Sequence, residues 1–262
     1  MYCMKPLLYN KKGLVTGIIN QHSIAYSIAK TLKSHGAHIA LSYQSESILV
    51  KNRDISKELC SDFCGVIDFS DHDSVDAYYQ NIQKEWDNID FIVHSVAFAH
   101  KTTFTQPFVN ISREHFLESM NISCYSLIEL SNKFAQLMNN TGSILTVTYG
   151  SNRVVPGYNL MGVVKSALES TVKYLAYDLG SKNIRVNAIS SGPIKTVSSS
   201  VVPNIKSLTN KNYYNTPLNR NLLQSHVANA SLYLLSDLSE ATTGEVHFVD
   251  LGANIMNYTG KI

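Results

Sequence analysis

The stretch that decides the fold and the chemistry of this chain is Tyr149-Gly150-Ser151-Asn152-Arg153-Val154-Val155-Pro156-Gly157-Tyr158-Asn159-Leu160-Met161-Gly162-Val163-Val164-Lys165. A helical pattern begins just after Pro156, and Tyr158 and Lys165 lie seven residues apart within it. Because an α-helix has about 3.6 residues per turn, this spacing returns to nearly the same azimuth, about 10 Å along the axis. Met161 and Gly162 share that face. The spacing therefore predicts a phenol and an ammonium group on one side of a helix.

This pairing has a chemical use. A tyrosine with an ordinary pKa of roughly 10 is a poor acid at neutral pH, and a nearby positive charge lowers that pKa by favouring the phenolate. Tyr158 and Lys165 are therefore candidate catalytic residues. A tyrosine and a lysine also occur at this spacing by chance in many helices, so the pair alone leaves a structural explanation open.

Short apolar runs alternate with helical patterns along the chain. Strands are predicted at 13–17, at a short run ending at Asp68, and at 37–43, 89–95, 143–148, 184–189 and 245–249; helices are predicted at 23–35, 46–60, 74–86, 112–137 and 158–179. Parallel strands joined by crossover helices produce this order, which predicts an α/β, doubly wound, Rossmann-like sheet of about seven strands. We expect a single dinucleotide-binding domain over 1–262, with a substrate-covering loop around 197–222.

Composition narrows the class of protein. A net charge of +2, with 44% hydrophobic and 16% charged residues, is ordinary for a globular protein and gives no reason to expect nucleic acid or an anionic membrane as a partner. Four cysteines without a paired spacing predict reduced thiols in a cytoplasmic protein, and no metal site. No run of residues has the pattern of a signal peptide or of a membrane span.

Polar residues follow several of the predicted strands, at the edge where such sheets bind ligands. Gly17 allows a tight turn after the first strand, and Ser23 can cap a helix whose free amides would meet a pyrophosphate. A plain strand–turn–helix with a serine cap explains these two residues equally well. Asp68, at the end of the third predicted strand, is likewise explained as a plain turn residue.

The end of the second strand bears on the type of cofactor. Gln44 can hydrogen-bond ribose hydroxyls, whereas Glu46 would repel an additional phosphate, so this segment favours NADH over NADPH. If Gln44 is only a polar loop residue, the choice stays open. His94 ends a buried strand, where a histidine is more often a hydrogen-bonded structural group than a catalytic base.

Taken together, these motifs resemble the NADH-type enoyl-acyl-carrier-protein reductases of bacterial fatty-acid synthesis, within the short-chain dehydrogenase/reductase superfamily. That family's pattern is a first tyrosine, then Tyr-Asn-x-Met-Gly and a lysine; here these are Tyr149, Tyr158 to Gly162, and Lys165. An ordinary alcohol dehydrogenase of the superfamily has a serine about thirteen residues before the second tyrosine, where this chain has Leu145. Tyr149 takes over that serine's place.

The resemblance implies NADH-dependent reduction of the carbon–carbon double bond of trans-2-enoyl thioesters carried on acyl carrier protein. It implies Tyr149, Tyr158 and Lys165 as catalytic residues, and a homotetramer. The cofactor contacts it implies are Gly17, Ser23, Ile24, Gln44, Asp68, Phe69, Ser95, Val96, Ala97, Lys165, Pro193, Ile194 and Thr196. The substrate contacts it implies are Ala99, Tyr149, Tyr158, Met161, Val201 and Ile205, with Val202 and Leu208 as further candidates. Asn121 matches a position that supports the lysine through water, and Ser123 and Cys124 are expected only to pack.

Three departures from the family pattern accompany this resemblance. The interval from Tyr149 to Arg153 is one residue shorter than usual, Leu251 stands where a glycine is common, and the cofactor loop contains the bulky Ile18 and Ile19. Two other functions remain open: a carbonyl or alcohol oxidoreductase of the same superfamily, and a dinucleotide-binding protein without activity. The missing serine argues against the first, whereas only turnover distinguishes the second.

Overall fold

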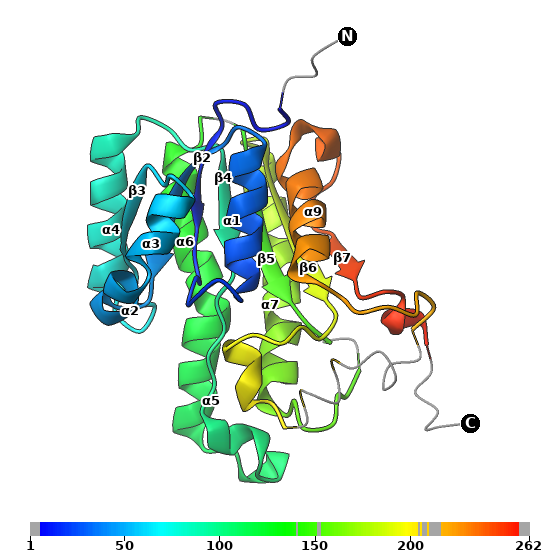
Figure 1. Ribbon diagram of the computed structural model, residues 1–262. Coiled ribbons are helices and arrows are strands. Elements are labelled where there is room, and N and C mark those ends of the chain that lie inside the picture. The colour runs from blue at the N-terminus through cyan, green and yellow to red at the C-terminus, as the bar shows by residue number, and fades with distance from the viewer. Residues whose placement is uncertain are drawn as a thin grey trace.

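The computed structural model describes residues 6–139, 141–150, 153–203, 205, 209 and 216–256. Its centre is a seven-stranded sheet in the order β3-β2-β1-β4-β5-β6-β7, with every neighbouring pair parallel (Figure 1). The strands are β1 (Lys12–Val15), β2 (His38–Tyr43), β3 (Phe63–Val66), β4 (Phe91–His94), β5 (Gly142–Thr148), β6 (Ile184–Ser191) and β7 (Val246–Val249). The predicted doubly wound α/β class is confirmed.

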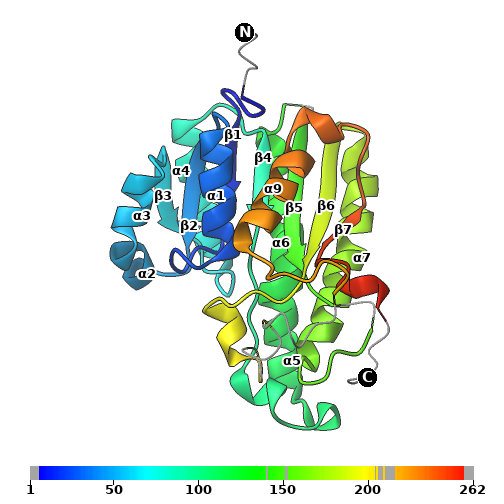
Figure 2. The same cartoon turned by 45° about the vertical axis from the view of Figure 1, so that its right-hand side comes forward.

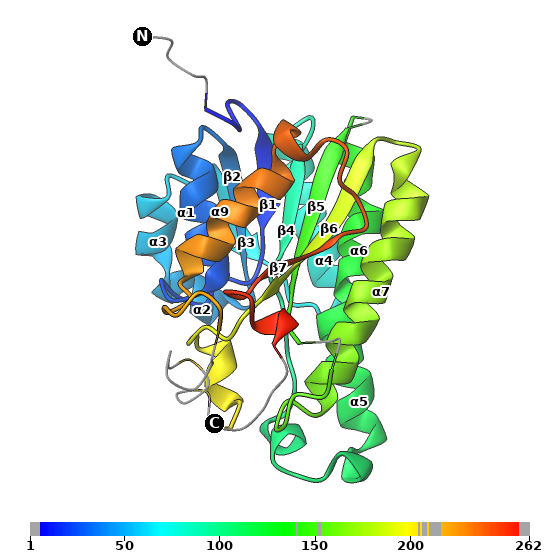
Figure 3. The ribbon, with the colours of Figure 1, turned by 90° about the vertical axis from the view of Figure 1, so that its right-hand side faces the viewer.

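Helices cover both faces of this sheet (Figure 3). One layer consists of α1 (Ile24–Ser34), α2 (Glu46–Lys51), α3 (Arg53–Glu58) and α9 (Gln224–Leu235), with α1 and α9 side by side in Figure 2. The other consists of α4 (His72–Glu85), α6 (Ser126–Phe134) and α7 (Leu160–Gly180). Helix α5 (Arg113–Met120) projects beyond the carboxyl edge of the sheet, below the strands in Figure 1.

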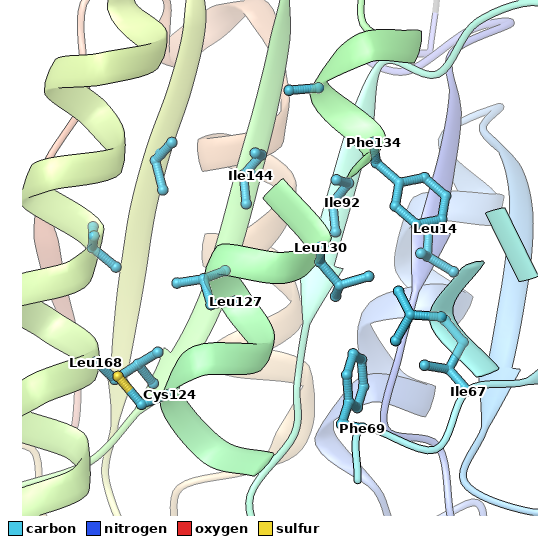
Figure 4. Close-up of a cluster of buried hydrophobic side chains, with 14 of the residues drawn as sticks. Leu14, Ile67, Phe69, Ile92, Cys124, Leu127, Leu130, Phe134, Ile144 and Leu168 are labelled. Atoms are coloured by element: carbon cyan, nitrogen blue, oxygen red, sulfur yellow. The ribbon is translucent and has the colours of Figure 1, made fainter. Parts of the chain in front are cut away.

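Two hydrophobic cores follow from the alternation of side chains along the strands. Leu14, Ile92 and Ile144 point to the α4–α6–α7 layer, whereas their neighbours Val15, Val93 and Leu145 point to the α1–α9 layer. Leu127, Leu130 and Phe134 of α6 fill the first core against these strands (Figure 4). Because both faces are covered, most positions of the central strands β1, β4 and β5 are buried, and apolar residues occur on both faces.

The predicted helix at 46–60 is wrong as a single element, because Asn52 divides it into α2 and α3. Asn52 has φ −110° and ψ 19°, outside the helical range, and its side-chain amide donates to the carbonyls of Ile48 (2.8 Å) and Ile19 (2.9 Å). The second bond attaches this break to the loop after β1. An asparagine whose side chain competes for backbone carbonyls is a physical reason for a helix to end.

The predicted helix at 112–137 also differs in its details. It consists of α5, a π-helix η3 (Asn121–Tyr125), α6 and a final 3₁₀ turn η4 (Ala135–Leu137). A π-helix holds one residue more per turn than an α-helix, and hydrophobic periodicity does not reveal where that residue is accommodated.

Two further differences from the predictions are the end of the third strand and an additional helix. The third strand ends at Val66, so Ile67 and Asp68 follow it as loop, and helix α9 was not predicted at all. Its buried positions include Val227, Ala228, Leu232 and Leu235, but alanine, serine and asparagine between them weaken the contrast between its faces. Within the described residues, no helix has both the length and the apolar character required to cross a membrane.

Candidate active site

The loops after β1 and β4 meet at the carboxyl edge of the sheet, at Gly17. Gly17 has φ +87°, and a Cβ atom placed there would lie 1.9 Å from the carbonyl oxygen of Ser95. Only glycine fits this crossing, for reasons of both conformation and space. The Ser95 amide in turn donates to Thr16 Oγ1 at 3.3 Å, which holds the two strand ends together.

Tyr149 and Tyr158 come together at the carboxyl end of β5. Tyr149 directly follows β5, and its ring packs edge-to-face on that of Tyr158, with centroids 5.0 Å apart and planes at 88°. Tyr158 is half-buried and packs against the core cluster that contains Met161. The two tyrosines expected at the site are thus neighbours, although nine residues separate them in the sequence.

Tyr158 does not belong to the helix that contains Lys165, and this part of the prediction is wrong. Helix α7 begins at Leu160, and Tyr158 lies in the turn before it, with its amide donating to the carbonyl of Val155 at 3.0 Å. The cause is Asn159, whose φ of +44° no α-helix can accommodate. The relation of the phenol to Lys165 therefore depends on this turn as well as on helical spacing.

Lys165 is buried on the inner face of α7. Its side chain is 4% exposed, and Nζ donates to the carbonyl of Val147 in β5 at 2.8 Å. Burial disfavours the ammonium and lowers the pKa of Lys165 to about 8, against the opposing effects of Cys124 and Glu169. Glu169, one turn further along α7, accepts a hydrogen bond from Thr148 Oγ1 at 2.8 Å.

Burial also raises the pKa of Tyr158. The expected lowering of this pKa by the lysine is therefore wrong for this structure, in which desolvation is the dominant effect and the Lys165 ammonium is bonded to the backbone of β5. A phenol with a raised pKa keeps its proton at neutral pH. Tyr158 is consequently suited to donate a hydrogen bond rather than to act as a base.

His94 is a structural group, as its position in the sequence indicated. It is fully buried, Nδ1 lies 2.8 Å from Thr146 Oγ1, and Nε2 lies 2.8 Å from Ser126 Oγ. Burial, together with the charge of Lys165, lowers the pKa of His94 to about 3. The imidazole is neutral at physiological pH, and both of its nitrogens have partners.

Ser23 occupies the N-cap position of α1, but the predicted side-chain cap is absent. Its hydroxyl instead accepts the backbone amides of Ile19 (3.0 Å) and Asn20 (3.2 Å). The serine thus fixes the loop that follows Gly17. Ile24 begins α1 directly after this loop, so the free amides of the helix N-terminus, which can bind an anion, lie next to the loop.

The two residues expected at the adenosine end lie at the carboxyl ends of β2 and β3. Gln44 is exposed directly after β2. The Asp68 carboxylate accepts from the amide (2.9 Å) and the hydroxyl (2.7 Å) of Ser70, which is the turn function considered for it. Phe69 is buried, and its ring contacts that of His94 edge-on at 6.0 Å. Its carbonyl oxygen lies 3.4 Å from Asn121 Nδ2.

The loop after β6 is folded around Ser199. Its hydroxyl donates to the carbonyls of Ile194 (2.9 Å) and Thr196 (3.2 Å), while Thr196 Oγ1 accepts the Ser199 amide at 3.0 Å. Pro193 and Ile194 are held close to the sheet by this arrangement, and the turn is followed by the 3₁₀ helix η5 (Ser198–Val201). Val202 packs on the core cluster of Tyr158, whereas Leu208 lies outside the described residues.

Residues 95–99, which follow β4, lie at the same carboxyl edge of the sheet. Val96 and Ala99 pack on the same core cluster, and Ala97 between them is exposed. Ser123 holds this segment in place: its hydroxyl accepts the Phe98 amide at 2.8 Å and donates to the Phe98 carbonyl at 3.0 Å. Ser123 was expected only to pack, and this reciprocal bonding has no counterpart in its sequence pattern. Cys124 does pack, buried between α6 and α7.

The departure at Leu251 does not remove the turn that glycine would form. Leu251 has φ +61° and Gly252 has φ +85°, so the leucine adopts a left-handed conformation itself. Arg153 donates from its two terminal nitrogens to the carbonyls of Met256 (3.0 Å) and Ala253 (3.1 Å). The shortened loop after Tyr149 is therefore attached to the segment that follows this turn.

A doubly wound parallel sheet with a glycine crossing, a tyrosine pair and a buried lysine at its carboxyl edge defines a dinucleotide-dependent oxidoreductase of the short-chain dehydrogenase/reductase type. Residues 17–254 match the family model described as enoyl-(acyl carrier protein) reductase. The chain belongs to this family, as the motifs around Tyr158 indicated.

Individual relatives and solved structures agree with this family assignment. The chain is 45% identical to the enoyl-[acyl-carrier-protein] reductase [NADH] FabI of Rickettsia typhi, over 95% of this chain and 96% of that one. Among solved structures it resembles the Anaplasma phagocytophilum enoyl-(acyl-carrier-protein) reductase in complex with NAD, with a TM-score of 0.93, 44% identity, and coverage of 97% of this chain and 98% of that one. FabI from Candidatus Liberibacter asiaticus gives a TM-score of 0.94 at 43% identity, covering 98% and 100% of the two chains.

Proposed function

We propose that this protein catalyses the NADH-dependent reduction of trans-2-enoyl thioesters carried on acyl carrier protein, as one catalytic domain over 1–262. The observation that carries the proposal is the pairing of Tyr149 with Tyr158, whose ring centroids are 5.0 Å apart, together with the buried Lys165, which donates to the carbonyl of Val147 near the end of β5. An enoyl reductase needs a hydrogen-bond donor for a thioester oxygen, and a protonated tyrosine in a partly apolar surrounding meets that need.

The residues at the carboxyl edge fit a nicotinamide dinucleotide. Gly17 lets the backbone after β1 pass against the carbonyl of Ser95, and the chain leads from there to the N-terminus of α1, whose free amides can bind a pyrophosphate. Gln44 offers an amide to ribose hydroxyls, and Glu46, the first residue of α2, disfavours the additional phosphate of NADPH. The names of the curated relatives agree with NADH. When bound, NADH supplies the hydride that reduces the double bond.

Three residues carry the chemistry in this proposal. Tyr158 donates a hydrogen bond to the thioester oxygen and stabilises the negative charge that develops there. Lys165 binds the nicotinamide ribose through its ammonium group, and since its pKa is about 8 the group is still mostly protonated at neutral pH. Tyr149 packs on the ring of Tyr158 and lines the substrate pocket where other members of the superfamily have a serine.

The remaining expected contacts are distributed around these three residues. The backbone from Ser95 to Ala97 and the loop around Pro193, Ile194 and Thr196 would enclose the nicotinamide half of the cofactor. Ala99, Met161, Val201 and Ile205 would line an apolar slot for the acyl chain, with the 197–222 segment covering it. Val201 is 36% exposed, which leaves apolar surface available to a substrate.

We also propose a cytoplasmic homotetramer. Tyr174 and Tyr177 of α7 are 75% and 85% exposed, and exposed apolar side chains from α5 to α6 include Leu117 of α5, Tyr125 of η3 and Ile128 of α6. Exposed aromatic residues in such number favour burial against a second copy. Sedimentation of a Tyr174→Glu/Tyr177→Glu variant tests the assembly, which we expect to dissociate.

Of the cysteines in the described part of the chain, all three are free thiols, which agrees with a reducing compartment.

The decisive experiment is an assay of NADH oxidation with crotonyl-coenzyme A and with a longer enoyl thioester. We expect turnover with NADH and clearly less with NADPH. If a ketone or an alcohol is the substrate and no enoyl thioester is reduced, the protein is instead a carbonyl oxidoreductase of the same superfamily. NADH binding without oxidation of any substrate would identify a dinucleotide-binding protein without activity.

A further inference from the structure

Asn159, the residue after Tyr158, has an unusual backbone conformation. Its φ of +44° and ψ of −118° are close to those of the first central residue of a type II′ turn, a position that glycine dominates. The amide of Met161 donates to the carbonyl of Tyr158 at 3.1 Å and closes this turn. A residue with a side chain adopts such a conformation only where its surroundings impose it, and these positions cluster at functional sites.

The side chain of Asn159 shows what imposes it. Nδ2 donates to the carbonyl oxygens of Gln106 at 3.0 Å and of Thr103 at 3.2 Å. Both acceptors lie in or beside the 3₁₀ helix η1 (Lys101–Phe104), which Thr103 and Phe104 anchor with fully or almost fully buried side chains. The turn that contains Tyr158 is thus attached to a fixed part of the segment that continues from β4.

Capping of helix α7 does not account for this residue. Asn159 stands at the N-cap of α7, where asparagine normally accepts an amide from the first turn, yet its side chain makes no such bond. Its amide points instead to the η1 carbonyls. The conformation of Asn159 therefore serves the connection between the two segments.

We propose that Asn159 is a positioning residue that fixes the orientation of the Tyr158 phenol. Its backbone places Tyr158 in a turn outside α7, where the ring meets Tyr149, and its two hydrogen bonds keep that turn from moving relative to η1. This inference rests on the proposed function of Tyr158 as the donor to the substrate oxygen.

Three substitutions separate the two contributions of Asn159. Asn159→Gly allows the backbone conformation but removes both hydrogen bonds. Asn159→Asp keeps a side chain that tolerates positive φ but sets a carboxylate against two carbonyl oxygens. Asn159→Ala removes the hydrogen bonds and disfavours the conformation as well.

The expected result is a loss in kcat without a loss in cofactor binding. A displacement of a reacting group by about 1 Å can reduce the rate by about 100-fold, so we expect kcat to fall about 10-fold in Asn159→Gly and about 100-fold in Asn159→Asp and Asn159→Ala. The KM for NADH should change less than about twofold, because the Asn159 contacts lie away from the β1 loop. Wild-type kcat in Asn159→Asp and Asn159→Ala would overturn the inference.

Asn183 provides the matched control. It also has a positive φ, +53°, but is exposed in the turn between α7 and β6, at the opposite edge of the sheet. Asn183→Ala and Asn183→Asp should lower the melting temperature and leave kcat unchanged. If the Asn183 variants lose as much kcat as the Asn159 variants at equal loss of stability, the effect of Asn159 is only structural.

A spectroscopic readout keeps this test independent of the proposed reaction. With tyrosine labelled at Cζ by carbon-13, the Tyr158 resonance can be assigned by its loss in Tyr158→Phe. We expect its chemical shift and its titration to change in all three Asn159 variants and not in the Asn183 variants. An unchanged Tyr158 resonance refutes the positioning role, whereas a wild-type protein that reduces no enoyl thioester but shows the expected change refutes the proposed function alone.

Discussion

His94 and Lys165 are both buried, both basic and close to the same edge of the sheet, yet their surroundings differ. His94 has a side-chain hydroxyl at each ring nitrogen, from Thr146 and from Ser126. Within the described residues, the Lys165 ammonium group has one acceptor, the carbonyl of Val147, although it can donate three hydrogen bonds. Burial lowers the pKa of both groups, to about 3 for His94 and to about 8 for Lys165.

This difference in hydrogen-bond partners distinguishes a structural group from a functional one. A histidine kept neutral with both nitrogens bonded has no remaining capacity for a ligand. A lysine kept in a partly apolar site, still charged at neutral pH and with donors to spare, can bind one. The four predictions below test this distinction, beginning with the largest expected effect.

The largest effect is expected in the rate. Tyr158→Phe removes one hydrogen-bond donor to the developing negative charge, which typically costs about 3–4 kcal/mol, or about 100- to 1000-fold in kcat. Lys165→Met should reduce kcat/KM by a similar factor, while the melting temperature stays within a few degrees of wild type because a buried charge is removed together with its hydrogen bond. Steady-state kinetics and calorimetry measure both. If Lys165→Met is fully active, Lys165 is a structural group like His94, and the distinction between the two residues is wrong.

The next effect is expected in stability. His94→Phe conserves the ring but leaves the hydroxyls of Thr146 and Ser126 without their imidazole partner, which should lower the free energy of unfolding by about 1–3 kcal/mol. We expect kcat to change less than about threefold. His72→Phe is the matched control, since the His72 ring is 64% exposed and pairs with Glu129 at 2.6 Å, so we expect a smaller loss of stability than for His94→Phe. A large loss of kcat in His94→Phe would assign His94 a catalytic role.

The third effect is the pH dependence of stability. The pKa of His94 is about 3 in the folded chain and 6.5 ordinarily, so between these values the unfolded chain binds more protons than the folded one. The stability that neutral His94 contributes is therefore fully present above pH 6.5 and is lost as the pH decreases through this window, by on the order of 1 kcal/mol per pH unit. Lys165 acts in the same direction between about 8 and 10.5, where stability should rise with pH. Denaturant titrations of wild type and His94→Phe measure this; equal slopes below pH 6.5 would contradict it.

The smallest effect is expected in cofactor affinity. Ser23→Ala removes the acceptor of the Ile19 and Asn20 amides, which are then free to reorient. One hydrogen bond contributes about 1 kcal/mol, so we expect the KM for NADH to rise about fivefold at constant kcat. Ser70→Ala, which affects the turn at Asp68, serves for comparison. An unchanged KM in Ser23→Ala would show that the loop is fixed by Gly17 and Asn52 alone.

Most of the fold could be predicted from the sequence because the apolar strands are short, continuous and separated by helical patterns. Strands β1, β2, β4 and β5 were each located to within two residues at both ends. The splits at Asn52 and at the π-helix could not be predicted, since each depends on a tertiary hydrogen bond or on one accommodated residue. Helix α9 lacked the polar contrast by which a helix is recognised.

The site was predicted less completely than the fold. The motif around Tyr149, Tyr158 and Lys165 and the position of Gly17 led to residues that the structure brings to one edge. Ser123 and Asn159 were missed as contributors, because their importance lies in bonds to carbonyls 25 and 53–56 positions away in the chain. The direction of the Tyr158 pKa shift was also wrong, because the sequence does not show how far burial outweighs a neighbouring charge.

The π-helix at Asn121–Tyr125 has a consequence for the way this chain can change length. It holds one more residue than an α-helical turn, and Ser123, which fixes the segment after β4, lies at its centre. Deleting a single residue there would restore an α-helix and, because the π turn accommodates that extra residue within about one turn, would leave α5 and α6 in nearly the same relative orientation. The deletion would instead remove or displace Ser123, so an alignment gap within this turn would mark a chain in which the segment after β4 is held differently.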